Sequence, residues 1–459
     1  MKRLLCYWLI LVLTAAGVPA WAEGTADPVA DTVAMLRDPA QASALFDRLT
    51  PEMQSALPAA ALAGLWPQLE ASGGAFVALE DDGFSTEQAV LTIYTRTVRM
   101  TSMSLACTLV LDGEGLIAGL SFTPVARFET PGSDAVQLPD GVTEEEVTVG
   151  EAPWQLPGTL TLPSAEGKLP AVVLVHGSGP RDRDETVGAV KPFRDLAYGL
   201  ARQGIAVLRY DKRTSVHAQA IASDTETYAA FTVEEETIQD AIAAARLLAA
   251  DERIDARRIF VLGHSLGAML APRIVSESED LFAGMVLACG TDRTLLDIMV
   301  RQNETAAAAV IRTNPAAGAL VEEQLRQMRQ EVEAFALMDE ETARKATVFG
   351  QPGLYFYDMA QSPSASELMA ELALPALVIN GERDFQIIPA EGRETWERIL
   401  PMDAPWLTCL WADVNHMLMK PDVPENAAGT TAEYETPCAV DEAIIMAIGD
   451  FVLNTEETK

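Results

Sequence analysis

The second part of the chain alternates short apolar runs with longer stretches whose apolar residues recur at helical spacing. From about residue 144 onward, the apolar runs are bounded by charged residues or glycine, as in strands that are buried on both faces. One helix is predicted to begin at Thr232, because Glu235 stands three residues later as in a capping box. This alternation predicts an α/β fold, a mostly parallel sheet with helices on both faces. The predicted strands are 171–175, 205–208, 259–262, 285–288, 374–380 and 406–411, after an opening antiparallel pair at 146–149 and 158–162.

The region before residue 130 has a different pattern. Apolar residues follow a helical spacing over about 27–70, and alternating or continuous apolar segments follow. Asp112-Gly113-Glu114-Gly115 separates two of these segments and is typical of a hairpin turn. The pattern therefore predicts a small α+β domain over 23–130. Its predicted strands lie within 88–102, 105–111 and 116–122.

Residues 131–143 are rich in proline, glycine and aspartate and are predicted to be a linker. The larger domain is predicted to occupy 144–459. We therefore expect two folded domains joined by a short polar connection.

The first 22 residues form a separate segment. A basic start, Met1-Lys2-Arg3, precedes the apolar run 4–16 and then Ala20-Trp21-Ala22, which together match a secretory signal peptide. A membrane anchor is the alternative, but the apolar run is shorter than the roughly 20 residues that span a bilayer. We expect cleavage near Ala22, no stable membrane anchor, and a mature protein that is secreted or periplasmic.

The net charge limits the expected binding partners, and the cysteine content limits the possible disulfides. The formal net charge of −34 disfavours nucleic acid and anionic membrane surfaces as partners. The sequence does not define an oligomeric state. Four cysteines follow the leader, and the preferred pairing is Cys409 with Cys438, with four buried thiols as the alternative.

Gly263-His264-Ser265-Leu266-Gly267 lies between the predicted strand 259–262 and a helix rich in small residues. Glycines on both sides of a serine relieve crowding in a tight strand-to-helix turn. Such a turn would expose the hydroxyl of Ser265 above the sheet, where it could serve as a nucleophile.

His176-Gly177-Ser178-Gly179 follows the predicted strand 171–175. Acyl transfer passes through an oxyanion that needs two N–H donors, one from the residue after the nucleophile and one from the loop after this strand. We assign the predicted oxyanion hole to the backbone N–H groups of Leu266 and Ser178. An ordinary glycine-rich turn is the alternative interpretation.

Several short segments of the larger domain match one known pattern. They are His176-Gly177-Ser178-Gly179-Pro180, Arg183-Asp184-Glu185, Lys191-Pro192-Phe193-Arg194, Arg209-Tyr210-Asp211-Lys212-Arg213 and the turn around Ser265. Together they resemble secreted bacterial α/β-hydrolases of the dienelactone hydrolase and serine aminopeptidase-like group. Some members of that group also carry a small N-terminal α+β domain.

The resemblance implies a Ser-Asp-His triad in that order along the chain. Asp384 matches the Gly-x-x-Asp turn of the family and is the implied acid, with Glu382 and Asp413 as competitors. His416 is the only one of four histidines that follows Ser265, so it is the candidate base.

The other three histidines receive non-catalytic interpretations. His264 is expected to pack or hydrogen-bond, His176 to orient the oxyanion loop, and His217 to be solvated. The sequence contains no His-x-x-x-His, Cys-x-x-Cys or phosphate-binding loop, so no metal and no cofactor are expected.

Residues 291–365 interrupt the alternation of strands and helices. Helices are predicted at 295–311, 321–337 and 340–346, where α/β-hydrolases carry a lid over the active site. The expected function is hydrolysis of small carboxylic esters through an acyl-enzyme. A serine peptidase acting on short peptides and a non-enzymatic binding protein are the alternatives.

Overall fold

The structure is a computed structural model that describes residues 27–38, 41–57, 59–80, 84–88, 91–101, 104–125, 138–313, 318–349, 351–424 and 428–455. The predicted signal peptide, 1–22, lies outside the described residues, as does 131–137 of the predicted linker. The chain divides into two compact units. One comprises the described residues up to 125 together with Ala218–Thr225, and the other comprises the rest.

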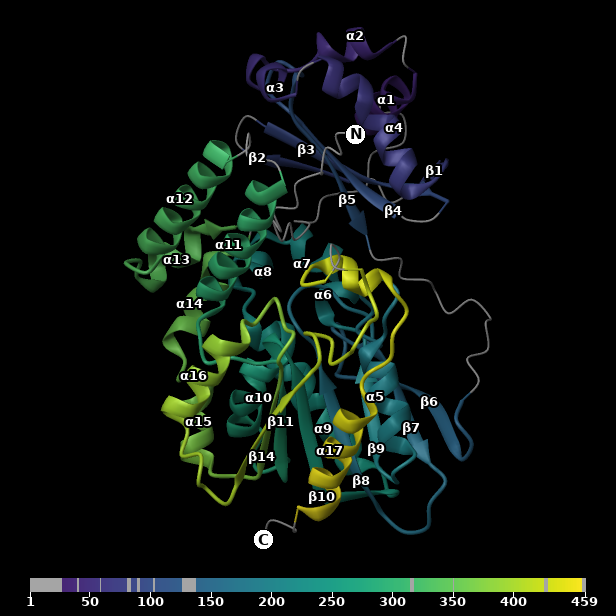
Figure 1. Ribbon diagram of the computed structural model, residues 1–459, viewed down its shortest axis with the longest axis vertical. Helices are drawn as coiled ribbons and strands as arrows, with labels where there is room; N and C mark the ends of the chain where they lie inside the picture. Colours follow the sequence, from purple (N-terminus) through teal and green to yellow (C-terminus); the bar gives the residue numbers. More distant parts are fainter. Residues whose placement is uncertain are drawn as a thin grey trace. The chain divides into compact units, whose positions relative to one another are not determined.

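The N-terminal unit is a five-stranded antiparallel sheet with helices (Figure 1). Alternate residues of β4, Leu105, Cys107 and Leu109, are buried in one core with residues of α1 and α4. The hairpin predicted at 112–115 is present, because the Asp112 carboxylate accepts the N–H groups of Glu114 and Leu116, each at 2.9 Å. Its elements are α1 (Pro28–Arg37), α2 (Ala42–Phe46), α3 (Pro51–Ala56), α4 (Ala59–Gly73), β1 (Phe76–Leu79), β2 (Phe84–Gln88), β3 (Leu91–Met100), β4 (Ser104–Leu111) and β5 (Ile117–Val125).

The second unit is built on an eight-stranded sheet in the order β15-β14-β11-β10-β8-β9-β7-β6. The six strands from β15 to β9 run parallel to their neighbours, and β6 and β7 add the antiparallel pair that the sequence predicts. The strands are β6 (Val142–Val149), β7 (Leu156–Pro163), β8 (Leu169–Val175), β9 (Ala206–Tyr210), β10 (Ile254–His264), β11 (Gly284–Ala288), β14 (Ala376–Gly381) and β15 (Leu407–Ala412).

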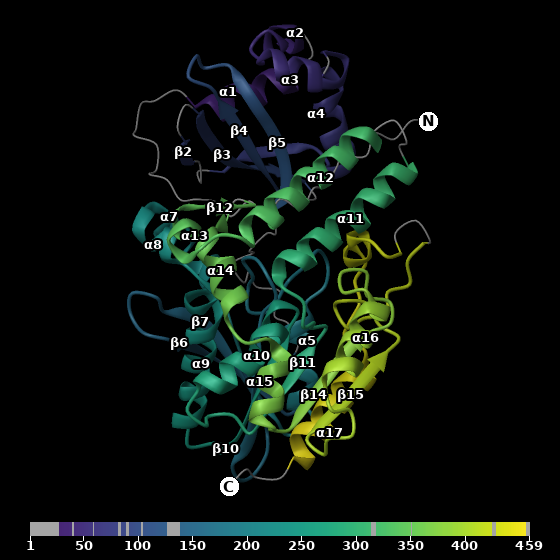
Figure 2. The same cartoon turned by 90° about the vertical axis from the view of Figure 1, so that its left-hand side faces the viewer.

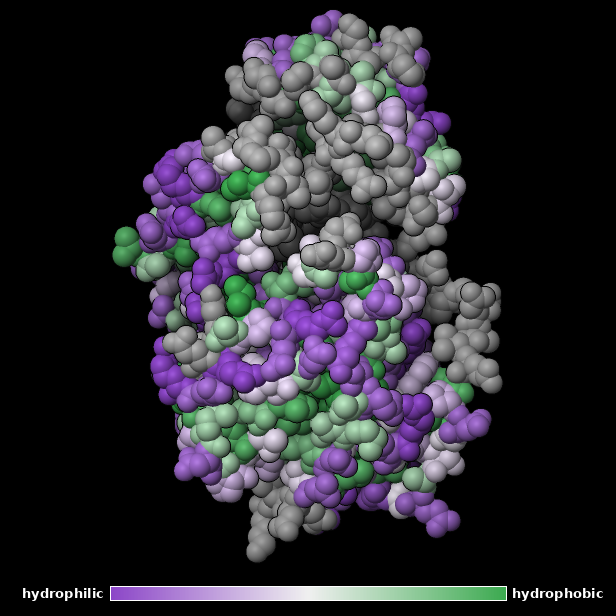
Figure 3. Space-filling model, viewed as in Figure 1, coloured by the Kyte–Doolittle hydropathy of each residue, from purple (hydrophilic) through white to green (hydrophobic). Residues whose placement is uncertain are grey.

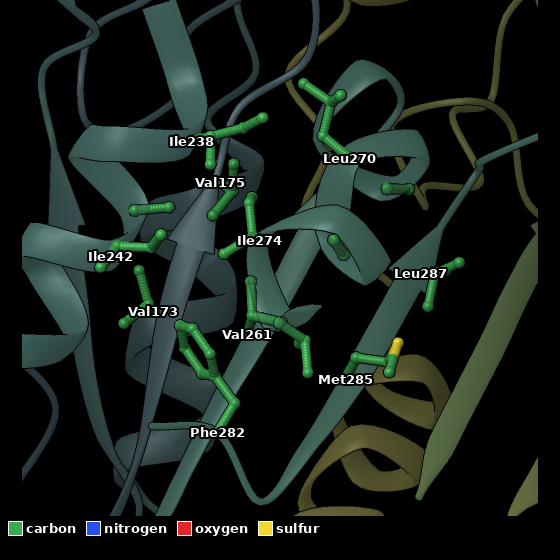
Figure 4. Close-up of a cluster of buried hydrophobic side chains, with 14 of the residues drawn as sticks. Val173, Val175, Ile238, Ile242, Val261, Leu270, Ile274, Phe282, Met285 and Leu287 are labelled. Carbon is green, nitrogen blue, oxygen red and sulfur yellow. The ribbon is translucent and has the colours of Figure 1, made fainter. Parts of the chain in front are cut away.

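Both faces of this sheet are covered, because the side chains of a strand point alternately to its two sides. Val173 and Val175 of β8 belong to the core shared with α9 and α10 (Figure 4), whereas Val172 and Leu174 belong to the core shared with α5 and α17. This arrangement confirms the predicted fold class. The helices are α5 (Pro192–Ala201), α9 (Gln239–Ala250), α10 (Leu266–Glu277), α15 (Ala365–Leu372), α16 (Pro389–Ile399) and α17 (Glu442–Asn454).

A helical insertion separates β11 from α15. Its two longest helices, α11 and α12, pack side by side in Figure 2. Charged residues are frequent along α12, and Figure 3 shows a mainly hydrophilic surface over this helix. The insertion consists of α11 (Leu295–Thr313), α12 (Gly318–Phe335), α13 (Glu340–Lys345), the β12 (Thr347–Val348) and β13 (Gln351–Pro352) pair, and α14 (Gly353–Gln361).

The helix predicted to begin at Thr232 is present, and Glu235 accepts the Thr232 N–H at 2.9 Å. Its first part is a π-helical turn, η2 (Glu234–Ile238), which continues into α9. One local prediction is wrong. The preferred disulfide is absent, since Cys409 and Cys438 are free and half-buried. Short helices α6 (Arg213–Val216), α7 (Ala218–Ser223) and α8 (Thr225–Ala230) precede η2, and η4 (Thr431–Glu435) precedes α17. Among the described residues, no helix combines the length and apolar character needed to cross a membrane.

Candidate active site

Ser265 occupies the turn between β10 and α10. Its backbone has φ 53° and ψ −113°, a conformation that residues with a side chain rarely adopt. The Ser265 N–H donates a 2.9 Å hydrogen bond to the carbonyl oxygen of Ala288, which ties the turn to the neighbouring strand β11. Ser265 is half-buried, so the strand-to-helix turn holds its side chain at the carboxyl end of the sheet without enclosing it.

The glycines on either side of Ser265 are required by close backbone contacts. A Cβ at Gly263 would lie 2.1 Å from the carbonyl oxygen of Gly267, and a Cβ at Gly267 would lie 2.3 Å from that of Val175. No side chain fits at these distances. The Gly-x-Ser-x-Gly pattern is therefore dictated here by packing between β10, α10 and β8.

Asp384 and His416 meet at the same edge of the sheet. Asp384 follows β14, and its Oδ2 accepts a 2.7 Å hydrogen bond from Nδ1 of His416, which follows β15. The other carboxylate oxygen accepts the backbone N–H groups of Gln386 at 2.7 Å and Ile387 at 2.9 Å. Both side chains are buried. The carboxylate is thus fixed by three donors, and it holds the proton of the imidazole on Nδ1, leaving Nε2 as the acceptor.

The two competing acids have other environments. Glu382 forms an ion pair with Arg393 at 2.8 Å, with both side chains substantially exposed. Asp413 is exposed. The geometry therefore favours Asp384 as the partner of His416.

Asn415 organises the loop that carries His416. Its side-chain oxygen accepts the N–H groups of Met417 at 3.0 Å and Met419 at 3.1 Å, and its Nδ2 donates to Glu433 at 2.9 Å. Asn415 has no role among the predictions made from the sequence. Its hydrogen bonds define the path of the backbone on the C-terminal side of His416.

His264 forms a buried ion pair with Glu185. Its Nε2 donates to the carbonyl oxygen of His416 at 2.8 Å, and its Nδ1 lies 3.0 Å from Oε1 of Glu185. A carbonyl and a carboxylate only accept, so both ring nitrogens carry protons. Burial alone would lower the pKa of His264, but the Glu185 carboxylate raises it above its ordinary value. For Glu185, burial favours the neutral acid, yet the charge and hydrogen bond of His264 lower its pKa to about 2.

The loop that contains the predicted oxyanion donor Ser178 lies against this pair. The backbone N–H of Gly177 donates to Oε1 of Glu185 at 2.7 Å. A Cβ built at Gly177 would be 3.2 Å from Cβ of Ser265, so the loop passes directly beside the serine. Ser178, the next residue, is exposed, and Leu266 begins α10, where backbone N–H groups have no intrahelical acceptor. Of the two predicted oxyanion donors, Leu266 directly follows Ser265, and Ser178 directly follows Gly177, which lies beside Ser265.

His176 packs in the loop as a neutral residue. Its Nε2 donates to the carbonyl oxygen of Asp182 at 3.0 Å, and its ring contacts Phe193 with centroids 5.0 Å apart. Burial lowers the pKa of His176 to about 4. The predicted orienting role agrees with these contacts. His217 binds the carbonyl oxygen of Gln155 at 2.9 Å and is more constrained than a solvated side chain.

A small cavity adjoins the loop that carries Asp384. One side is formed by α11 and the residues before it, and the other by the segment after Asp384. The insertion therefore lies beside the segment that follows Asp384. The cavity is lined by Thr291, Arg293, Ile298, Arg301, Gln386, Ile387, Ile388 and Gly392.

Among the described residues, one group of side chains has the composition of a metal site. The ligand atoms of His264, Cys289 and His416 lie within 4.8 Å of one another. Both nitrogens of His264 and Nδ1 of His416 are already hydrogen-bonded, and burial raises the pKa of the Cys289 thiol. A metal here would have to displace a hydrogen bond of His264 and the proton of the Cys289 thiol.

The fold and this site define a hydrolase. The model of the alpha/beta hydrolase family matches residues 172–429, and the chain belongs to this family. Esterase EstD of Thermotoga maritima is 34% identical over 403 residues, which cover 88% of this chain and 89% of that protein. This alignment is longer than 144–459, so the similarity extends into the N-terminal unit.

Two solved structures have low overall similarity. An esterase of Pyrococcus furiosus is 18% identical, with a TM-score of 0.38, and covers 68% of this chain and 91% of that chain. A puromycin-hydrolysing peptidase of Mycobacterium tuberculosis is 15% identical, with a TM-score of 0.42, and covers 84% of this chain and 48% of that chain.

Proposed function

We propose that this protein hydrolyses small carboxylic esters, with Ser265 as nucleophile, His416 as general base and Asp384 as the acid of the triad. The observation that carries the proposal is the 2.7 Å hydrogen bond between His416 and Asp384 at the sheet edge that also holds the turn of Ser265. The similarity to EstD, which is named an esterase, supports the ester class.

In the first half-reaction, the Oγ of Ser265 attacks the ester carbonyl carbon while Nε2 of His416 takes the hydroxyl proton. The carbonyl electron pair moves to oxygen, and the N–H groups of Ser178 and Leu266 stabilise the oxyanion. The electron pair then returns and breaks the bond to the leaving oxygen. The alcohol departs with the proton from His416 and leaves an acyl group on Ser265.

In the second half-reaction, water attacks the acyl carbon and gives a proton to His416. The same oxyanion forms and collapses, the acid leaves, and Ser265 regains its proton. Asp384 keeps the proton of the imidazole on Nδ1 and stabilises the imidazolium in both halves. The fixed carboxylate suits this role, because its three donors prevent it from rotating away.

The helical insertion would act as the lid of this site. Ile298 of α11 lines a small cavity together with Ile387 and Ile388, which follow Asp384 in the chain. Arg293 and Arg301 line the same cavity and add positive charge. We infer that the surface contributed by α11 helps to select among ester substrates by its shape.

A direct test compares p-nitrophenyl esters of graded acyl length with aminoacyl anilides, using Ser265→Ala as the control. Esters should be the faster substrates, and Ser265→Ala should lower kcat by about 10⁴ to 10⁶. Faster cleavage of the anilides would favour a peptidase. Wild-type ester hydrolysis in Ser265→Ala would rule out the proposed mechanism.

A further inference from the structure

Gly177 lies between two buried charged side chains, one at its carbonyl oxygen and one at its N–H. The Nζ of Lys212 donates a 2.8 Å hydrogen bond to the carbonyl oxygen of Gly177. The N–H of the same glycine donates to Glu185 at 2.7 Å. Lys212 is 2% exposed and Glu185 1%, so both contacts are shielded from water.

The contact made by Lys212 fixes the direction of the N–H of Ser178. In a trans peptide, the carbonyl oxygen of one residue and the N–H of the next point to opposite sides. An ammonium on the carbonyl of Gly177 therefore holds the Ser178 N–H within the same plane, pointing away from Lys212. This N–H is the donor that the proposed function assigns to the oxyanion hole.

The local sequence gives this peptide little rigidity of its own. Gly177 has no Cβ to restrict its backbone, and Gly179 adopts a φ of 78°. The peptide that joins Gly177 to Ser178 therefore has no side chain on its Gly177 side to restrict its rotation, yet an oxyanion donor has to be in place before charge develops. The hydrogen bond from Lys212 supplies the restraint that the glycines lack.

Lys212 is itself held by a chain of contacts that reaches the helical insertion. Its Nζ forms an ion pair with Oε1 of Glu236 at 3.2 Å. The other oxygen of Glu236 accepts a 2.6 Å hydrogen bond from the hydroxyl of Tyr355, which belongs to α14. The positions of Lys212 and of the insertion are therefore linked through one carboxylate.

A buried ammonium is costly to desolvate, and an apolar residue of similar length often serves stability as well or better. What an apolar residue cannot provide is a donor for the carbonyl of Gly177. We propose that Lys212 is a positioning residue for the Ser178 N–H. Glu236 and Tyr355 couple the contact between Lys212 and Gly177 to the position of the helical insertion. This inference rests on the proposed function, because it concerns the oxyanion hole of that reaction.

The test replaces the ion pair as a unit, so that no buried charge is left unpaired. The variant is Lys212→Met with Glu236→Gln. The chain offers a matched control in the adjacent pair Arg213 and Asp240, which is equally buried, with contacts of 2.5 and 3.1 Å. Arg213→Met with Asp240→Asn removes a comparable ion pair whose hydrogen bonds do not involve Gly177.

We expect the Lys212 double variant to lose about 10²- to 10³-fold in kcat, as when an oxyanion donor is removed, with KM changed less than about threefold. The Arg213 double variant should keep kcat within about threefold. A trifluoromethyl ketone, which adds Ser265 Oγ to form a tetrahedral oxyanion, should bind more weakly to the Lys212 variant by the same factor as the loss of kcat/KM. A purely structural role would not produce this parallel loss.

Tyr355→Phe is the milder second variant, because it keeps the ammonium and removes one hydroxyl. It should lower kcat by roughly tenfold, as expected for loss of a hydrogen bond to a charged group. It tests the coupling even if the Lys212 variant does not fold, since an unchanged kcat in Tyr355→Phe would overturn the coupling between Lys212 and the insertion.

The outcomes separate the two proposals. Ester hydrolysis that does not depend on Ser265 would overturn the proposed function itself. Hydrolysis that depends on Ser265, but is affected equally by the Lys212 and Arg213 double variants, would overturn the positioning role of Lys212 and leave the triad in place.

Discussion

Nε2 of His264 donates a 2.8 Å hydrogen bond to the backbone carbonyl oxygen of His416. The residue before the proposed nucleophile therefore holds the residue proposed as base. Through Nδ1, the same imidazole reaches Glu185, which also accepts the N–H of Gly177. One ion pair thus connects three separate loops.

Asp384→Asn should lower kcat by about 10⁴ with little change in thermal stability. An amide can donate to Nδ1 of His416 and so favour the tautomer that has its proton on Nε2, where a base must accept. Steady-state ester hydrolysis measures the effect. Glu382→Gln is the control, since Glu382 pairs with Arg393 on the surface, and its kcat should stay at the wild-type value. If Glu382→Gln lost activity and Asp384→Asn kept it, Glu382 would be the acid of the triad.

Gly267→Ala should prevent folding or abolish activity, because the new Cβ would lie 2.3 Å from the carbonyl oxygen of Val175. Gly392→Ala is the matched comparison. A Cβ there meets Ile387 at an ordinary 3.7 Å, and the position lies inside α16, where alanine is favoured over glycine by about 1 kcal/mol. Soluble yield and thermal denaturation distinguish them. Equal stability of the two variants would contradict the contacts described for the turn.

Glu185→Gln should make the stability less dependent on acid pH. The pKa of Glu185 is lowered from 4.5 to about 2, so its carboxylate stabilises the fold above the unfolded pKa. This contribution, about 3 kcal/mol, is lost as pH falls from about 4.5 to 2. The raised pKa of His264 affects stability at higher pH. The stabilisation by its imidazolium is fully present below pH 6.5 and is lost as pH rises through the pKa of His264 in the folded protein.

Urea denaturation at pH 5.5 and pH 3 tests this expectation. The wild type should exceed Glu185→Gln in the free energy of unfolding by about 3 kcal/mol at pH 5.5, and by less at pH 3. Glu145→Gln removes an exposed partner of Arg253 and should change stability by about 1 kcal/mol or less. A difference between wild type and Glu185→Gln that does not vary with pH would show that Glu185 is not ionised in the fold.

The strands and the serine turn are predictable from sequence because their causes are local. Buried parallel strands need continuous apolar runs, and the crowding around Ser265 needs glycine at fixed positions. Glu185 and Lys212 are not predictable in this way. Glu185 ends a charged run, 181–185, that has the composition of a solvated loop, and its burial depends on His264, 79 residues later in the chain.

The other misses also involve partners that are distant in sequence. The proximity of Cys409 and Cys438 in the last segment suggested a disulfide, but one lies on β15 and the other precedes α17, and both remain free. Lys212 lies in a segment shared with known hydrolases, and this resemblance was the only sequence signal for it. Its partners are Gly177 in the loop after β8 and Glu236 in η2, and these contacts become visible only once the chain is folded.

The unusual backbone of Ser265 has a consequence for how this protein could change over time. Glycine adopts φ 53° without the steric penalty that a side chain incurs, so Ser265→Gly should raise the free energy of unfolding by roughly 1 kcal/mol while abolishing hydrolysis. Chemical denaturation beside an ester assay would measure both effects. Selection for stability alone would remove this serine, and only continued selection for catalysis can retain it.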